Sequence, residues 1–481
     1  MLDASGLSFD HAVSADPLSM ERIEVLRGPG ALQYAGSAVG GVVNVIDCRI
    51  PREAVFDAQG GTSGKLDLGL ASGNAERGTG VVLEGGNQRY AWHTEFEGTE
   101  VGTVFNNRGT EWRLEARHVP LGALDGLLGL QVEQASFSAD GDEAFAPYSQ
   151  TRQRAWFVHE ELSTSWGRLS AGARAESVKV NSAGHPSIVR FVPASRQYRP
   201  GSVALGALWN VAPHWQLSAN LARTERAPKD YELYADGPHL ATHAYEVGDA
   251  SFGKERSTNL DVGLNFKQGA KRFGLSAFVN RFRHYLSQQA TGLNRDLAGN
   301  GAQGLGVSDC GDGSSVESGC SAEILPEYRY TAVAARFTGL EAKGSVRLID
   351  QAQTLDLEWR ADRVRARNTD TGEALPRIAP ERLGATLLWA RGPWSARLGA
   401  SHSAAQTRLP LNQLPTEAHT LWNAWLGYRT GSGDAKWLWY ARIDNLSDRL
   451  AYSASSILTQ TAPGKAPLPG RSLKLGLQAG F

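Results

Sequence analysis

The chain has 481 residues, too many for one ordinary soluble core and enough for one large barrel. Its 49 Lys and Arg residues balance its 50 Asp and Glu residues, which argues against a basic surface that binds nucleic acid. Glycine and tryptophan are frequent, with 54 and 13 residues, whereas there are only 3 Cys and 2 Met. This composition is typical of a β-protein of the bacterial envelope.

The first residues of the chain do not have the features of a signal peptide. Residues 1–5 contain no basic start, and neither an apolar stretch nor a small-residue cleavage site follows them. Two explanations stay open on this evidence: a signal peptide has been removed, or the start of the protein is truncated.

A glycine-rich stretch at residues 27–41 separates two short apolar runs. Residues 23–26 and residues 42–46 are each predicted to form a strand, and the glycines between them allow a sharp turn and tight packing. A phosphate-binding loop is the competing interpretation. The glycine spacing fits neither the Walker A motif nor the dinucleotide fingerprint, so we set that interpretation aside.

From about residue 64 onward, apolar residues alternate with polar or small ones in roughly 18 segments. The longest apolar runs are too short for a membrane-spanning helix, but a barrel strand needs only about 9–11 residues. We therefore predict an all-β fold, an antiparallel transmembrane β-barrel. Clear examples are residues 215–222, 260–267, 422–428, 437–443 and 472–481.

The last segment shows which faces are expected. Its apolar residues should face lipid and its polar residues the lumen, because side chains alternate across a strand. The predicted lipid-facing residues are Leu473, Leu475, Leu477 and Phe481, and the predicted lumen-facing residues are Lys474 and Gln478.

Tryptophans near segment ends indicate the aromatic girdles of a membrane barrel. A soluble β-sandwich or propeller would use the same residues for ordinary packing, but at this length it would need several domains, and no linker follows Pro51. The tryptophans concerned are Trp156, Trp209, Trp215, Trp394, Trp422 and Trp439.

The connections between segments fall into two classes. Some are tight, as at residues 391–393, and others are long and polar, as at residues 226–256 and 289–327. Short turns on one side and long extracellular loops on the other are typical of outer-membrane barrels. Cys310 and Cys320 lie in one long loop, where they form either a disulfide or two free thiols.

The third cysteine, Cys48, lies near the predicted junction of the N-terminal piece with the barrel and is expected to be unpaired. Three cysteines placed in this way do not indicate a metal cluster.

Several motifs together resemble one family. Residues 20–34, with the run Glu-Arg-Ile-Glu-Val-Leu-Arg-Gly-Pro, and residues 36–46 closely resemble the end of the plug domain of TonB-dependent receptors. Residues 444–448 resemble the family's penultimate-strand motif, and residues 469–472 lead into a last strand that ends in Phe481. The resemblance covers nearly the whole chain. It implies that residues 1–51 are the C-terminal part of the plug and that residues 52–481 are the barrel.

The resemblance implies a location in the bacterial outer membrane and no required cofactor. It also implies three kinds of partner: the TonB–ExbB–ExbD energy-coupling complex for the full-length receptor, the barrel assembly machinery, and outer-membrane lipids with lipopolysaccharide. An enzyme is not expected, because no nucleophile elbow occurs in a fitting context.

The chain departs from the family pattern in three ways. A full plug is much longer, and its missing part carries the TonB box that the energy-coupling protein pulls. Receptors of this kind usually have about 22 strands, whereas this sequence has roughly 18 alternating segments. Residues 95–100 also resemble sequence from the middle of such a barrel, although they lie near its predicted start. We therefore expect a fragment, the product of a degraded gene or an internally deleted gene product, in which active transport is in question.

Two stretches, residues 8–17 and residues 232–249, resemble the zinc-uptake branch of the family. In that branch an Asp–His pair on the plug faces the lumen and binds zinc, and a His and a Glu of the barrel complete the site. Nitrogen and oxygen ligands of this kind suit Zn²⁺. Zinc is therefore the expected transported ligand.

The resemblance assigns Asp10 and His11 as the plug ligands, and His239 and Glu160 as the barrel ligands. If His239 does not face the site, His243 is the alternative histidine ligand of the barrel. Adjacent Asp10 and His11 also fit a simple turn with a side-chain hydrogen bond, and a His in a polar loop is often only solvated.

Three functions remain open on the sequence. The first is a receptor for zinc or a zinc complex. The second is a receptor for ferric siderophores, which would need aromatic and Arg-rich loops, or for haem, which would need a pair of lumen-facing His residues. The third is a structural or adhesive barrel without transport, since the TonB box is absent from this sequence.

Overall fold

The computed structural model describes residues 20–26, 28–34, 42–47, 60–72, 76–86, 91–97, 105–140, 144–297, 299, 301–302, 324–432 and 435–480. Almost all regular structure in these residues is β-strand. None of the helices found there is long and apolar enough to cross a membrane. The possible disulfide between Cys310 and Cys320, and the position of Cys48, lie outside the described residues.

Eighteen long strands form the wall in the described part of the chain, in agreement with the number of alternating segments. They are β3 (Gly61–Ala71), β4 (Glu76–Gly86), β5 (Ala91–Glu97), β6 (Phe105–Arg117), β7 (Leu124–Ala139), β8 (Tyr148–Thr164), β9 (Gly167–Gly184), β11 (Gly201–Ala212), β12 (Trp215–Arg226), β15 (Glu255–Gln268), β16 (Lys271–Asp296), β18 (Ile324–Asp350), β19 (Thr354–Asn368), β20 (Arg382–Arg391), β21 (Trp394–Ser403), β22 (His419–Ser432), β23 (Ala435–Asp444) and β24 (Ser472–Gly480).

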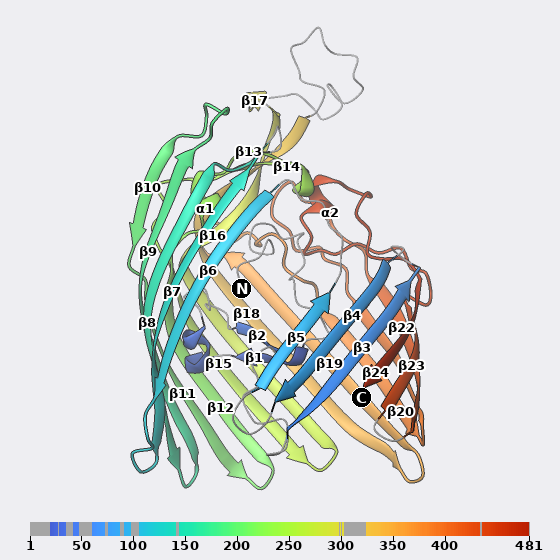
Figure 1. Ribbon diagram of the computed structural model, residues 1–481. Coiled ribbons are helices and arrows are strands. Elements are labelled where there is room, and N and C mark those ends of the chain that lie inside the picture. Colours follow the sequence, from blue (N-terminus) through green and yellow to red (C-terminus); the bar gives the residue numbers. More distant parts are fainter. Residues whose placement is uncertain are drawn as a thin grey trace.

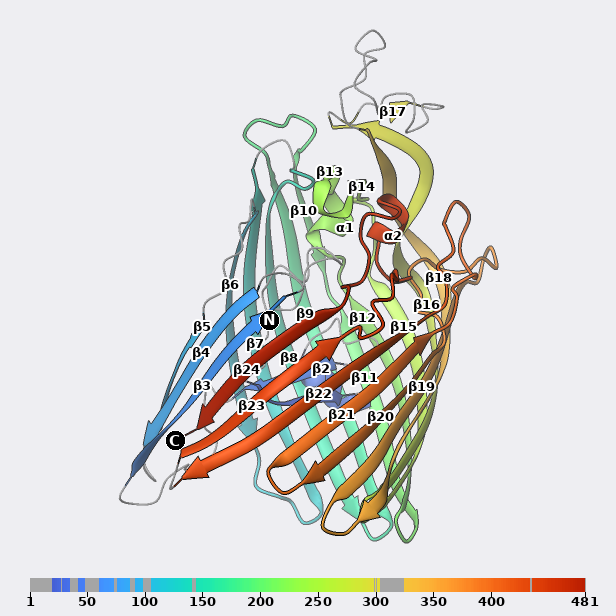
Figure 2. The same ribbon diagram turned by 90° about the vertical axis from the view of Figure 1, so that its right-hand side faces the viewer.

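The wall is one antiparallel sheet that winds into a barrel (Figures 1 and 2). Register pairing runs from β6 through β24, and β24 then pairs with β3, which leads on to β4 and β5. In the closed ring order of the barrel, β5 is followed by β6, which completes the wall.

The two ends of the barrel differ as the sequence predicts. At one end the connections are tight, as at Gly392, whose φ of 54° lies in the left-handed region that glycine tolerates. At the other end long connections carry short elements, among them β10 (Pro193–Tyr198), β17 (Gly301–Ala302) and the helix α2 (Leu458–Thr461) (Figure 1). The long connections are therefore on the extracellular side.

Inward and outward positions alternate along the wall strands. In β11, Leu205 is 63% exposed on the outside, whereas its neighbour Ala204 is 2% exposed on the inside. In β24, Leu473 and Leu475 are 45% and 53% exposed, as predicted for lipid-facing side chains. The side-chain direction of Phe481 lies beyond the described residues.

Aromatic residues gather at the tight-turn end of the wall. The rings of Trp166 and Trp209 lie 5.7 Å apart, and those of Trp394 and Tyr428 lie 4.5 Å apart. Each pair joins residues next to a tight turn. They form part of an interfacial girdle, which the sequence indicated.

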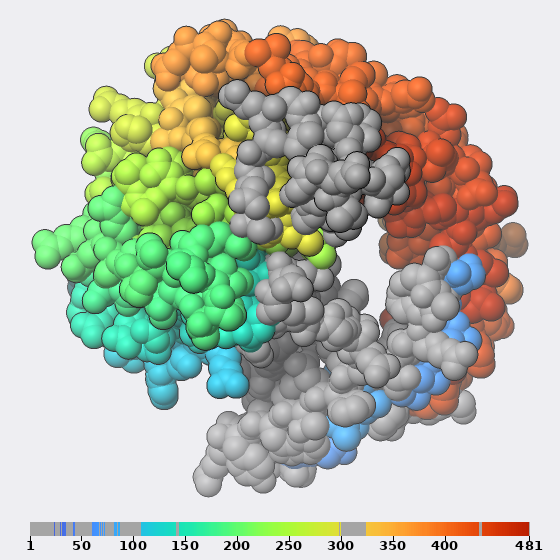
Figure 3. Space-filling model, turned by 90° about the horizontal axis from the view of Figure 1, so that it is seen from above, coloured from blue at the N-terminus to red at the C-terminus, as the bar shows by residue number. Residues whose placement is uncertain are grey.

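The N-terminal piece lies inside the barrel. Its strands β1 (Met20–Leu26) and β2 (Val42–Asp47) pair antiparallel, and the 3-10 helix η2 (Gly28–Gln33) between them contacts β8, β9, β11 and β12. A Cβ added to Gly172 would come within 2.9 Å of the Pro29 carbonyl oxygen, and one at Gly206 within 3.2 Å of Pro29 Cδ. Glycine in the wall thus makes room for η2. Seen from above, the barrel is hollow beside its C-terminal strands (Figure 3).

The outward position of Leu475 gives a test of the lipid face. The Leu475→Arg variant should lose about 2–4 kcal/mol of folding free energy in lipid vesicles, because it places a charge in the hydrocarbon. Gln478→Arg, on the inner face of the same strand, should change it by less than about 1 kcal/mol. Equilibrium urea unfolding measures both, and equal losses would contradict the assignment of faces.

Candidate functional site

One long connection between wall strands folds back at the mouth of the barrel. Between β12 and β15 the chain forms the short helix α1 (Asp230–Tyr234) and then strands β13 (Asp236–His239) and β14 (Ala244–Val247). The two strands pair as a hairpin, and β14 also pairs in parallel with β18. The hairpin is therefore fastened to the wall (Figure 1).

The turn of the hairpin sets the position of its polar side chains. It is a single turn of 3-10 helix, η3 (Leu240–Thr242), closed by His243 with φ of 50°. His is among the non-glycine residues that adopt this left-handed conformation more readily. His239 then pairs with Ala244 in the hairpin register. As a result, His239 and Glu246, seven residues apart, lie on the same face.

His239 is buried in a set of specific contacts, with 1% of its surface exposed. Its Nδ1 atom lies 2.9 Å from Oε1 of Glu246. The Thr242 hydroxyl donates to the same carboxylate oxygen at 3.0 Å, and the Tyr330 hydroxyl donates to Oε2 at 3.2 Å. The imidazole stacks on Phe145, with ring centroids 4.2 Å apart and planes tilted by 5°. These contacts hold both side chains of the His239–Glu246 pair in place.

The Glu246 carboxyl is ionised in this site. Burial would raise its pKa, but the hydrogen bond from His239, the charge of His239 and the Thr242 hydroxyl outweigh burial and hold the pKa below its usual value. An ionised carboxylate only accepts hydrogen bonds. In either charge state Nδ1 of His239 therefore donates to Glu246, and when the ring is neutral its lone pair lies on Nε2.

This is the arrangement that orients a histidine for a metal ion. Metal-ligating histidines usually donate their other N–H to a carboxylate, which fixes both the tautomer and the ring direction. The sequence interpretation selected His239 but not Glu246. The only signal for Glu246 was its place seven residues later in the same zinc-branch stretch.

The remaining predicted ligands are not brought together in the described residues. Asp10 and His11 lie outside them, so their place in the site stays a prediction. His243 is half-buried, and no described residue is hydrogen-bonded to its Nδ1 atom. Within the described ranges, no group of three His, Cys, Asp or Glu residues converges to hold a metal ion.

The structure corrects the expectation for Glu160. Its carboxylate bonds His118 Nε2 at 3.1 Å, and it lies on the same outward face of β8 as the exposed Trp156. Glu160 lies twelve residues along β8 from Tyr148, which begins the strand at its extracellular end. At the rise of a β-strand this separation is about 40 Å. His239 is at that extracellular end. The two residues therefore cannot share one ion, because a single residue step along β8 turned Glu160 to the lipid side.

A buried ion-pair cluster holds the connection to the wall. Arg226, at the end of β12, bonds both carboxylate oxygens of Glu232 at 2.8 Å, and its Nε donates to Glu255 at 3.0 Å. Glu232 belongs to α1 and Glu255 begins β15. All three side chains are buried or nearly so. The cluster thus ties α1 to two wall strands and sets the starting point of the hairpin.

Other arginines at the mouth are also engaged in the scaffold. Arg295 and Arg329 both bond Glu327, at 2.5 and 3.1 Å. The two guanidinium groups balance the charge of this buried carboxylate. Arg377 donates to the Gln288 side chain at 2.6 Å. These side chains stabilise the loops, and their donors are directed at protein groups.

The comparisons with known proteins agree with this architecture. Residues 52–446 match the family model described as TonB dependent receptor-like, beta-barrel. The chain belongs to the TonB-dependent receptor family. Proteins of this family are receptors and transporters of the Gram-negative outer membrane, and this chain is an outer-membrane protein.

A curated relative and several solved structures are similar to this chain. The vitamin B12 transporter BtuB of Photobacterium profundum is 28% identical over 179 residues, which are 33% of this chain and 30% of that protein. The match thus spans less than a third of the relative.

The copper transporter OprC superposes with a TM-score of 0.71 at 14% identity, covering 97% of this chain and 87% of that one. The FrpB iron transporter from Neisseria meningitidis (F3-3 variant) has a TM-score of 0.62 at 11% identity, with 97% and 88% covered. At these identities the likeness shows the fold. The predicted family is confirmed, whereas membership of the zinc-uptake branch stays a prediction.

Loss of Arg226 from the buried ion-pair cluster should destabilise the protein much more than loss of an exposed arginine. Arg226→Ala should lower the free energy of unfolding by about 3–5 kcal/mol, because it leaves two buried carboxylates without their cation. The control is Arg168→Ala, which removes an exposed partner of Glu161 at 2.8 Å and should cost about 1 kcal/mol or less. Urea titration followed by tryptophan fluorescence compares the two variants, and similar midpoints would refute the role of the cluster.

Proposed function

We propose that this chain is the barrel part of a TonB-coupled receptor that takes up a scarce metal, zinc or a zinc complex. The observation that carries the proposal is the buried His239–Glu246 pair at the extracellular mouth. Imidazole nitrogen and carboxylate oxygen are ligand types that suit Zn²⁺. In this proposal His239 coordinates the metal through Nε2, and Glu246 positions the ring.

A position at the mouth fits capture followed by release. His239 lies on a hairpin between extracellular connections, whereas η2 of the N-terminal piece lies inside the barrel. If the remaining ligands come from the plug, as Asp10 and His11 are expected to do, movement of the plug would break the ligand set. Binding would then weaken when the energy-coupling protein pulls the plug of the full receptor.

The alternative of a ferric siderophore receptor has less support. An anionic siderophore would need arginines that present donors to it. In the described part of the mouth, Arg295, Arg329 and Arg377 donate to Glu327 and Gln288. The pair at His239 fits a cation better. A barrel without transport is the third possibility, and it predicts no specific metal binding.

Substitution of His239 tests the proposal. The purified, refolded 481-residue chain in detergent should bind Zn²⁺ in isothermal titration, and His239→Ala should weaken that binding by more than about ten-fold. Glu246→Gln should weaken it by about 10–100-fold, because the ring loses its orienting carboxylate. His185→Ala, which changes a histidine of another extracellular connection, is the matched control. Unchanged binding in both site variants would defeat the proposal.

The pH dependence of zinc binding gives a second test. Because the pKa of Glu246 is lowered, its carboxylate stays charged below neutral pH and keeps its orienting role there. Zinc affinity should nevertheless fall as the pH drops, because protons compete with the metal for the imidazole nitrogen. Titrations from neutral to mildly acidic pH measure this, and a constant affinity over that range would exclude a histidine ligand.

A further inference from the structure

A row of arginines crosses the outer face of the wall. Arg223 of β12 pairs in register with Thr258, and Thr258 pairs with Arg281 of β16. Arg281 then pairs with Arg336 of β18, and Arg336 with Arg367 of β19. The row spans four strand spacings, or about 20 Å. We call these four arginines the arginine row.

The register and the exposure place this row on the outside of the barrel. Arg223, Arg281 and Arg367 are exposed and Arg336 is half-buried. Leu221 and Leu340, which share a strand face with Arg223 and Arg336, are 51% and 55% exposed to the outside. The row therefore stands directly above lipid-facing apolar side chains.

The row lies toward the extracellular end of the wall. Arg223 is three residues from the upper end of β12, and Arg367 is one residue from the upper end of β19. A charge there lies near the interface, where an outward Arg costs only about 0–1 kcal/mol, against about 2–4 at the bilayer midplane. The row is thus at the level of the headgroups of the outer leaflet.

The arginine row has an unbalanced positive charge. Its four side chains form no ion pair, hydrogen bond or ring contact with any described residue. Two carboxylates at the ends of neighbouring strands are already engaged, since Glu225 bonds Lys254 and Arg256, and Glu381 bonds Arg363 at 2.8 Å. Like charges directly opposite each other across strands destabilise a sheet. Anions from outside the chain would remove that repulsion.

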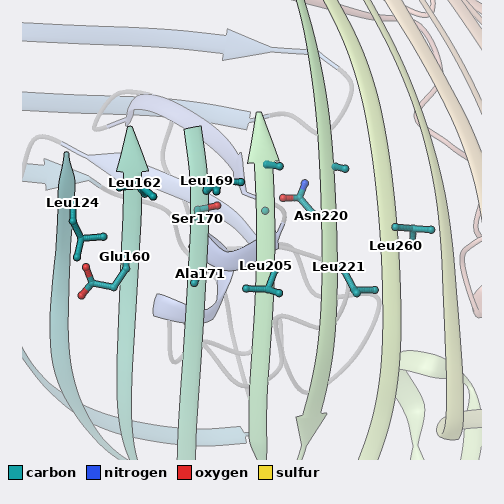
Figure 4. Close-up of a pocket in the computed structure, with 13 residues that line it drawn as sticks. Leu124, Glu160, Leu162, Leu169, Ser170, Ala171, Leu205, Asn220, Leu221 and Leu260 are labelled. Atoms are coloured by element: carbon teal, nitrogen blue, oxygen red, sulfur yellow. The ribbon is translucent and has the colours of Figure 1, made fainter. Parts of the chain in front are cut away.

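An apolar groove lies beside the row on the same outer face. It has a volume of about 500 Å³, and Ala171, Leu205, Leu221 and Leu260 are among the residues that line it (Figure 4). Leu221 is two residues below Arg223 on the same face of β12. Small side chains on neighbouring strands make the depression, and larger leucines border it. Its shape and polarity suit an acyl chain.

We propose that the arginine row binds the phosphate groups of a lipopolysaccharide molecule in the outer leaflet, with one acyl chain lying in the adjacent groove. Guanidinium groups bind phosphate through paired, charge-assisted hydrogen bonds, which makes arginine suited to such headgroups. Four cations over about 20 Å match a headgroup with more than one phosphate better than a phospholipid with a single phosphate. The extracellular position also selects the outer leaflet. This inference does not depend on the metal site.

The test uses the refolded 481-residue chain in a neutral detergent and purified rough-type lipopolysaccharide, with binding measured by isothermal titration. The triple variant Arg281→Gln, Arg336→Gln and Arg367→Gln should bind lipopolysaccharide more than about ten-fold more weakly than the unmodified chain. The control Arg360→Gln, Arg397→Gln and Arg442→Gln removes equal charge from the lumen side and should keep the original affinity. Heat-modified migration on gels verifies that both variants are folded.

Three further measurements separate the possible sources of phosphate. Enzymatically dephosphorylated lipopolysaccharide should bind the unmodified chain as weakly as intact lipopolysaccharide binds the triple variant. Phosphatidylglycerol should bind more weakly than lipopolysaccharide, and equal binding would overturn the assignment to the glycolipid. Ala171→Phe fills the groove and should weaken binding of intact lipopolysaccharide but not of its deacylated form. Equal affinity of the triple variant and the control would overturn the proposal as a whole.

Discussion

The rest of the structure depends on the pairing of backbone groups around the wall. A bilayer offers no water to the N–H and C=O groups of a strand, so each strand must find its partners in its neighbours. Once the strands pair, side chains must alternate between lipid and lumen. Outward leucines, the inward glycines that receive η2, and the outward arginine row all follow from that alternation. The mouth is different, because there the chain leaves the wall and forms its own contacts.

The wall was predictable from the sequence because its signal is repeated and local. Alternation in a segment such as residues 472–481 needs no knowledge of distant residues, and the glycine-rich N-terminal stretch needs only its turn chemistry. Glu160 shows where this reasoning ends. His159 and Glu160 are adjacent in the sequence, yet they occupy opposite faces of β8, and only the register with β7 and β9 decides which one faces lipid.

The candidate site could be predicted only in part for a related reason. The stretch from residue 232 to 249 identified His239, but its environment is built from distant segments. Phe145 comes from the connection before β8 and Tyr330 from β18, and both meet His239 and Glu246 only in the folded barrel. The burial that makes the Glu246 carboxylate an effective orienting group is therefore a tertiary property. A pattern within one loop cannot show it.

The glycine seat beneath η2 has a mechanical consequence. Gly172 and Gly206 present backbone to Pro29, and Leu32 packs against the small side chains of Ala204 and Ala222. The Arg113 guanidinium of the wall donates to the Gln33 carbonyl at 2.6 Å. A seat of glycines and alanines resists sideways displacement, because the wall encloses it, but offers few protruding side chains to oppose movement along the barrel axis. A directional pull would therefore slide the piece before it deformed the wall.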